Sequence, residues 1–172
     1  MSEDPIKIFT DKKNKPKRIN TVLLNPTIDQ IYEIKNFKVG GTYKVSKNIV
    51  YPVGKAISFS LGIRELSKQE NIIKVIACIG KNEIQTYSNF LNSYNIKFKF
   101  IEVDGKTRSN KTINDPINKT TTHIREIGFQ LKNHEEELFI KAFEQSIEDN
   151  AIVVFSGSIP LGVENNIYNF RE

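Results

Sequence analysis

Two apolar segments place the strongest constraint on the fold of this chain. They are NIIKVIACIG at residues 71–80 and AIVVF at residues 151–155. Near-continuous apolar runs rich in β-branched side chains predict strands that are buried on both faces, as in a parallel sheet. Segments with a helical spacing of apolar residues flank these runs, at 55–68, from Asn82 onward and at 134–148. Strands that alternate with helices of this length predict an α/β domain with a largely parallel sheet.

Shorter signals complete the expected order of elements. INTVLL at 19–24 and IKFKFIEV at 96–103 are predicted strands. Asn82 and Gln85 have the spacing of a capping box, which predicts a helix start there. A last helix is expected to begin near Val163.

Two pairs of half-polar strands do not fit a sheet that is buried on both faces. One pair spans about 31–50, around the turn residues Gly40 and Gly41, and the other spans about 108–126. Each alternates apolar with polar residues, which predicts one solvated face. We therefore expect a separate small sheet that forms a flap over one end of the domain.

The distribution of charge argues against a nucleic-acid-binding domain. The formal net charge is +5, but residues 1–20 hold six Lys and Arg against three Asp and Glu, which leaves only +2 for the rest. Residues 1–18 are polar and are expected to form a disordered basic tail, and the domain to span 19–172. No apolar run approaches the ~18 residues of a membrane span. The single cysteine, Cys78, fits a reducing compartment, so we expect a cytoplasmic protein.

The stretch YPVGKAISFS, at 51–60, resembles a ligand loop but fails two familiar patterns. A Walker loop needs a glycine five residues before Gly54 and a hydroxyl after Lys55, and this chain has neither. The dinucleotide pattern G-x-G-x-x-G is absent too. The interpretation that remains is a helix N-terminus with free N–H groups, which can bind anions and hydroxyls in general. Alternatively, Gly54 only permits the turn and Lys55 is solvated.

Five motifs in order carry a resemblance to a known family. They are LNPTID at 24–29, VGKAIS at 53–58, IGKNE at 79–83, GKTRSN at 105–110 and SGSIPLG at 156–162. Together they resemble the PfkB carbohydrate kinases of the ribokinase-like superfamily, especially the 1-phosphofructokinase and tagatose-6-phosphate kinase branch. The resemblance implies a three-layer α/β/α domain with a small β-sheet lid that closes over a sugar. It also implies ATP and Mg²⁺ as cofactors and a sugar or sugar phosphate as substrate.

The resemblance also implies roles for individual residues. Asp29 would accept hydrogen bonds from sugar hydroxyls, or it only caps the turn after Asn-Pro. Arg108 would contact a phosphate, or it is a solvated arginine of the flap. Gly54 would let the backbone approach the sugar. The candidate substrate-binding residues are Asp29, Gly54, Lys55, Ser58, Arg108, Asn110, Ser156 and Ser158.

The loop departs from the family pattern G-G-K-G-x-N at three positions. Val53 and Ala56 replace glycines, and Ser58 replaces the sugar-binding asparagine. Val53 disfavours a positive φ angle and would crowd a ligand. The serine hydroxyl is shorter than an amide and offers fewer hydrogen-bonding groups. We therefore expect a different substrate or weaker binding.

The catalytic G-A-G-D segment of the family lies well beyond S-G-S-x-P-x-G and does not occur in these residues. We expect the C-terminal half of the fold to be missing, and with it most of the ATP site, so that the chain alone has no kinase activity and no catalytic residue. The spacing of His123 and His134 suggests no metal site. Two functions stay open: the sugar side of an ATP-dependent sugar or sugar-phosphate kinase, or a non-catalytic module that pairs through its lid strands as a homodimer.

Overall fold

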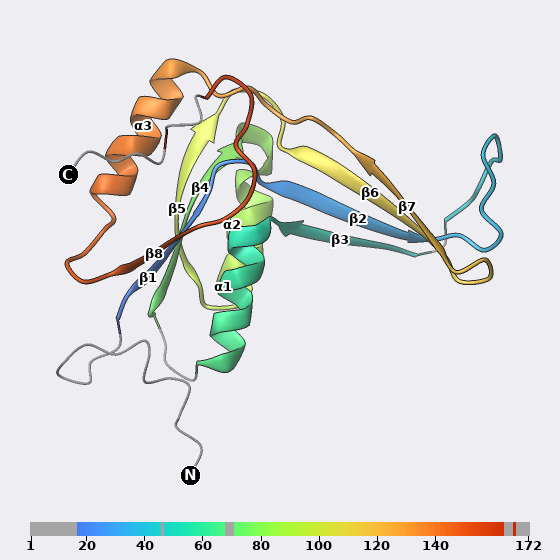
Figure 1. Ribbon diagram of the computed structural model, residues 1–172, viewed down its shortest axis with the longest axis horizontal. Helices are drawn as coiled ribbons and strands as arrows, with labels where there is room; N and C mark the ends of the chain where they lie inside the picture. Colours follow the sequence, from blue (N-terminus) through green and yellow to red (C-terminus); the bar gives the residue numbers. More distant parts are fainter. Residues whose placement is uncertain (1–16, 46, 68–70, 164–166, 168–172) are drawn as a thin grey trace, which may run out of the picture.

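The computed structural model describes residues 17–45, 47–67, 71–163 and 167. Its central sheet has four parallel strands in the order β5-β4-β1-β8 (Figure 1). The predicted parallel sheet is therefore confirmed. Its strands are β1 (Ile19–Leu23), β4 (Ile73–Gly80), β5 (Lys97–Val103) and β8 (Ile152–Phe155).

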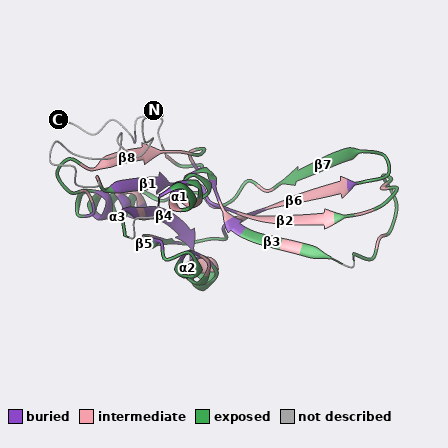
Figure 2. Ribbon diagram, turned by 90° about the horizontal axis from the view of Figure 1, so that it is seen from below, coloured by how far each residue is buried: buried purple, intermediate pink, exposed green. Residues whose placement is uncertain are grey.

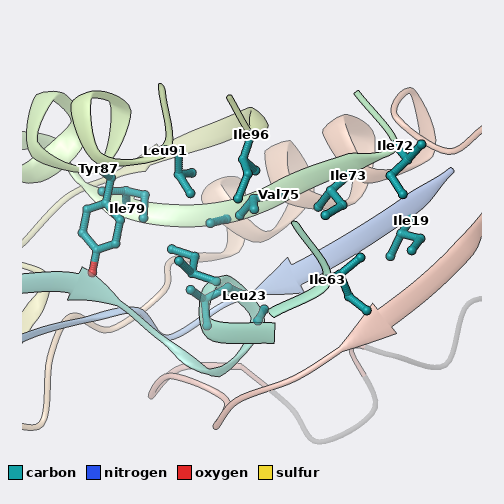
Figure 3. Packing of buried hydrophobic residues seen from close by; sticks show 13 residues of the cluster. Ile19, Leu23, Ile63, Ile72, Ile73, Val75, Ile79, Tyr87, Leu91 and Ile96 are labelled. Carbon is teal, nitrogen blue, oxygen red and sulfur yellow. The ribbon is translucent and has the colours of Figure 1, made fainter. Parts of the chain in front are cut away.

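Helices cover both faces of this sheet and give the three-layer α/β/α architecture. Alternate side chains of a strand point to opposite faces, so Leu23 of β1 joins one apolar cluster and Val22 joins the other. Both α1 (Lys55–Leu66) and α2 (Ile84–Ser93) contribute residues to the first cluster, whose side chains Figure 3 shows. The second packs under α3 (Asn133–Glu144), which contributes Phe139 and Phe143.

Three details differ from the sequence-based expectations. The capping box of Asn82 and Gln85 does not form, because residues Lys81–Glu83 form a 3₁₀ turn and α2 follows without a side-chain cap. Strand β8 is half-buried, since among the described strands it lies at the edge of the sheet and pairs with β1 alone. The expected tail at 1–18 and the helix expected near Val163 fall largely outside the described residues.

The second sheet projects from the core and carries most of its residues at intermediate or exposed positions (Figure 2). The expected separate small sheet is thus present. Its order is β3-β2-β6-β7, in which β2 and β6 are parallel and the outer pairs are antiparallel. The strands are β2 (Thr27–Glu33), β3 (Asn48–Val53), β6 (Arg108–Asp115) and β7 (Thr120–Arg125).

The first strand pair is displaced from the predicted span of 31–50. Strand β2 begins four residues earlier, at Thr27, and the described residues between Ile34 and Lys47 form no strand. The far end of the sheet is organised by Asp115, which is only 2% exposed. Its carboxylate accepts hydrogen bonds from the backbone N–H groups of Asn36, Phe37, Ile117 and Asn118 and from the Asn118 amide.

Candidate functional site

A cleft of about 620 Å³ lies where the carboxyl ends of β1 and β8 and the start of α1 meet the small sheet. Ligands of α/β sheets usually bind at this end of the strands. The cleft brings together every candidate site residue derived from the sequence. These are Asp29, Gly54, Lys55, Ser58, Arg108, Asn110, Ser156 and Ser158, and the lining is completed by Asn25, Thr27, Val53, Arg125 and Gly157.

Asp29 is held in place by two hydrogen bonds to one of its oxygens. The Thr27 hydroxyl donates to Asp29 Oδ1 at 3.0 Å, and Asn110 Nδ2 donates to the same atom at 3.1 Å. Asn110 lies opposite Asp29 in the register of β2 and β6, which places both side chains on one face of the small sheet. No described residue donates to Asp29 Oδ2, and Asp29 is one of the residues that line the cleft.

Arg108 is engaged with the junction between the two sheets. Its Nε donates to the Pro26 carbonyl at 3.1 Å, and its Nη2 donates to the Asn25 carbonyl at 3.1 Å. Nη2 also lies 3.4 Å from Ser158 Oγ, to which Asn25 Nδ2 donates at 3.1 Å. Arg108 therefore ties β6 to the segment that joins β1 to β2.

Gly54 is required by packing against the core. Its φ of 151° is unusual for an L side chain, and a Cβ atom there would lie 2.6 Å from Leu23 Cδ2. Gly157, with φ of 125°, meets the same leucine, since its Cβ would lie 3.2 Å from Leu23 Cδ1. The side chain that excludes a Cβ at Gly54 is thus in the apolar core, and not in the cleft.

The other loop substitutions have different surroundings from those expected. Val53 is not required to adopt a positive φ, because it is the last residue of β3 and pairs with Thr27. Ala56 is fully buried in the core, and Ser58 is exposed and lines the cleft. Gly54 supplies no side-chain cap, so the first N–H groups of α1 have no side-chain acceptor at its N-cap.

The charge in the cleft favours an anion. Its lining holds three cations, Lys55, Arg108 and Arg125, and one carboxylate, Asp29. Among the described residues, no group of three or more His, Cys, Asp or Glu side chains gathers in a way that could hold a metal ion. Cys78 is buried, and burial raises the pKa of its thiol far above the usual range, as expected for a core residue.

Thr27 and Arg125 were not singled out from the sequence. Thr27 falls inside the LNPTID motif, and its hydroxyl has a role only through its bond to Asp29. Arg125 lies in the segment KTTTHIREI, where no motif marks it. Its place in the cleft follows from the register of β6 and β7, which sets it opposite Asn110.

Known proteins resemble the chain over most of its length. A 1-phosphofructokinase of Bacillus subtilis is 33% identical over 152 residues, which make up 87% of this chain and 47% of that protein. The structure of a possible 1-phosphofructokinase from Thermotoga maritima matches with a TM-score of 0.78 and 30% identity, over 88% of this chain and 48% of that one. The chain is similar to the N-terminal part of PfkB-type 1-phosphofructokinases. No family model matches it.

The similarity to 1-phosphofructokinases confirms the resemblance drawn from the five motifs. The ribokinase-like fold is confirmed as well, since phosphofructokinase-2 from Escherichia coli matches with a TM-score of 0.79 at 22% identity, over 88% of this chain and 49% of that one. The chain spans about half the length of the relatives it matches. No helix in the described part of the chain is long and apolar enough to cross a membrane.

Proposed function

We propose that this chain forms the sugar-phosphate side of a PfkB-type kinase, which transfers a phosphoryl group from ATP to a phosphorylated hexose such as fructose 1-phosphate. The observation that supports this most is the composition of one cleft, which joins a fixed carboxylate to three cations. A sugar phosphate carries hydroxyl donors and an anion on one small molecule, and the cleft offers acceptors and cations within about 620 Å³.

The acceptor side of the cleft suits sugar hydroxyls. Asp29 Oδ2 is an acceptor without a described donor, and Thr27 and Asn110 fix the orientation of the carboxylate. The carbonyl oxygen of the Asn110 side chain is also buried without a partner. A buried acceptor without a partner costs free energy, so a hydroxyl that reaches it would be bound favourably. The N–H groups at the start of α1 add positive potential on the opposite side.

ATP and Mg²⁺ are implied by the family. Among the described residues, no group of three or more His, Cys, Asp or Glu side chains gathers that could hold Mg²⁺ without the help of substrate phosphates. The G-A-G-D segment that serves ATP-dependent transfer in the family does not occur in the 172 residues either. We therefore assign no step of phosphoryl transfer to the residues described, and the proposal for this chain concerns binding and orientation of the acceptor sugar.

Isothermal titration calorimetry of the 172-residue protein tests the proposal. Fructose 1-phosphate should bind, fructose should bind at least tenfold more weakly, and Asp29→Asn should weaken both because the carboxylate accepts from the sugar ring. Asp104→Asn is the matched control, since Asp104 lies outside the cleft and pairs with Lys132. If no hexose or hexose phosphate binds, or if both Asn variants behave alike, the proposed function is wrong.

A second candidate is an interaction module that pairs through the small sheet. Val50 of β3 and Ile124 of β7 are 47% and 51% exposed. The register of the strands sets both beside Gln30 and Lys111 in one row, on the face opposite to Asp29. Sedimentation equilibrium would show a homodimer that Val50→Lys and Ile124→Lys dissociate, whereas association unchanged by both substitutions would exclude this face.

A further inference from the structure

We infer that a second binding site, for a phosphate group, lies at the amino ends of β1, β4 and β5. This end of the central sheet is opposite to the carboxyl ends of the strands, where the cleft lies (Figure 1). The site is a cavity of about 210 Å³. Its polar lining consists of Arg18, Asn20, Asn71, Lys74, Lys97 and Glu148. The inference goes beyond the proposed function and does not depend on it.

The strand register places three hydrogen-bond donors in one row across the sheet. Asn20 of β1 pairs with Lys74 of β4, and Lys74 pairs with Lys97 of β5. Paired residues of a parallel sheet point to the same face, and neighbouring strands lie about 4.8 Å apart. Two ammonium groups and one amide can therefore donate to the oxygens of a single tetrahedral anion.

Asn20 supplies a buried donor without an acceptor. The residue is only 2% exposed, and its Nδ2 has no hydrogen-bond partner. A buried polar group without a partner costs about 1–3 kcal/mol. Val22, two residues further along the same face of β1, belongs to the apolar core, so packing alone would favour an apolar side chain at Asn20. An anion in the cavity would supply the missing acceptor.

The two lysines carry charges that no described carboxylate neutralises. Among the described residues, the cavity lining holds one carboxylate, Glu148, which pairs with Arg18 at 3.5 Å. Lys74 Nζ donates to the Ser146 carbonyl at 3.4 Å, which leaves two of its N–H groups, and Lys97 has no hydrogen bond or ion pair with a described residue. Like charges directly opposite each other on neighbouring strands destabilise a sheet, and an anion between the two lysines would remove this cost.

A second hollow adjoins the cavity and shares Asn71, Lys74 and Lys97 with it. Its volume is about 430 Å³, and Asn92 and Asn95 add two amide side chains to its lining. The cavity thus fits a phosphate group, and the hollow beside it fits a small hydroxylated molecule that carries this group.

Titration of inorganic phosphate into the ¹⁵N-labelled 172-residue protein, at constant ionic strength, tests the site. Phosphate should shift the side-chain amide resonances of Asn20, assigned from their loss in Asn20→Ala. Lys97→Gln should weaken phosphate binding about tenfold, the scale of one charge-assisted hydrogen bond. Lys99→Gln is the matched control, because Lys99 is equally an exposed lysine of β5 but lies opposite Ile76 and outside the cavity. Unmoved Asn20 resonances, or equal effects of the two variants, would overturn the inference.

Urea denaturation gives a result that a purely structural role of Lys97 would not produce. In phosphate-free buffer, Lys97→Gln should raise the urea midpoint, because it removes one member of the like-charged pair, and Lys99→Gln should not. Added phosphate should then raise the midpoint of the wild type more than that of Lys97→Gln. A lower midpoint for Lys97→Gln in phosphate-free buffer would contradict the inference.

Glycerol 3-phosphate distinguishes a free anion from a phosphate ester. If it shifts the Asn20 resonances with an affinity about tenfold higher than that of inorganic phosphate, and Asn92→Ala removes this gain, the ligand is a phosphorylated molecule. Equal or weaker affinity identifies inorganic phosphate as the ligand. Asn20 does not line the cleft, so its resonances report on this site even if no sugar phosphate binds the cleft and the proposed function fails.

Discussion

The side chain of Leu23 occupies the space that a Cβ atom at Gly54 would need, with Leu23 Cδ2 only 2.6 Å from that position. This contact joins the end of β1 to the residue before α1, directly behind the wall of the cleft. A glycine that a family pattern associates with a ligand is here fixed by an apolar neighbour 31 residues earlier in the chain.

Gly54→Ala should therefore lower the free energy of unfolding by about 2–4 kcal/mol, from the unusual φ together with overpacking against Leu23. Urea denaturation of the 172-residue protein measures it. Gly62→Ala is the matched control, because Gly62 lies in α1, which follows Gly54, and nothing lies within 4 Å of the added Cβ. That change should raise stability by about 0.5–1 kcal/mol. Equal effects at the two positions would contradict the packing argument.

Restoring the family glycine with Ala56→Gly should lower the free energy of unfolding without raising ligand affinity. Ala56 is fully buried among core residues in the first turn of α1, so Ala56→Gly should cost about 1–2 kcal/mol through helix propensity and a lost methyl contact. Ser58→Asn is the informative change, since Ser58 is exposed and lines the cleft. Calorimetry with fructose 1-phosphate should show a change for Ser58→Asn alone, and a gain from Ala56→Gly would contradict this.

Arg108→Ala should destabilise the junction of the two sheets by about 1–3 kcal/mol, because it leaves the carbonyls of Asn25 and Pro26 without their donor. Arg125→Ala, on the neighbouring strand of the same sheet, should leave the urea midpoint unchanged, since its guanidinium has no described partner. A loss of stability that is the same for both variants would show that Arg108 does not hold the junction.

Asp115 should give the small sheet an acid-sensitive contribution to stability. Burial tends to raise the pKa of this carboxyl, but hydrogen bonds from Asn118, Asn36 and Phe37 outweigh burial and lower it to about 2. A pKa below that of the unfolded chain, about 3.9, means that the contribution is present above pH 4 and is lost as the pH falls toward 2. Asp115→Asn removes it.

The difference in urea midpoint between the wild type and Asp115→Asn should thus be largest near pH 7 and should vanish toward pH 2. Asp104→Asn serves as the control, because that exposed carboxylate pairs with Lys132 at the surface. If the difference in urea midpoint between the wild type and Asp115→Asn stays constant from pH 7 to pH 2, ionisation of Asp115 does not stabilise the fold.

The sequence was sufficient for the features that depend on local pattern. The apolar run at 71–80 predicts β4, and the alternating segments at 108–126 predict β6 and β7. The motifs also predict which residues gather in the cleft, because strand ends and helix starts meet at one edge of the sheet. They could not show why Gly54 is a glycine, since the reasons are its φ of 151° and its contact with Leu23 in the core.

Arg125 could not be found from the sequence for a related reason. Its position depends on the pairing of β7 with β6, and one residue of slippage would turn it to the opposite face. The predicted first strand pair, at 31–50, begins later than β2 does. The segment TYKV at 42–45 alternates like a strand, but no described strand pairs with it.

Tyr87 links the small sheet to a helix that contributes no residue to the cleft lining. Its hydroxyl donates to the Thr27 carbonyl at 2.7 Å and lies 3.1 Å from the Val53 carbonyl, while its ring is fully buried beneath α2. The two strands that carry Asp29 and Val53 are therefore oriented from α2. A substitution that shifts α2 against the core should therefore change the geometry of the cleft, although every side chain that lines the cleft is left intact.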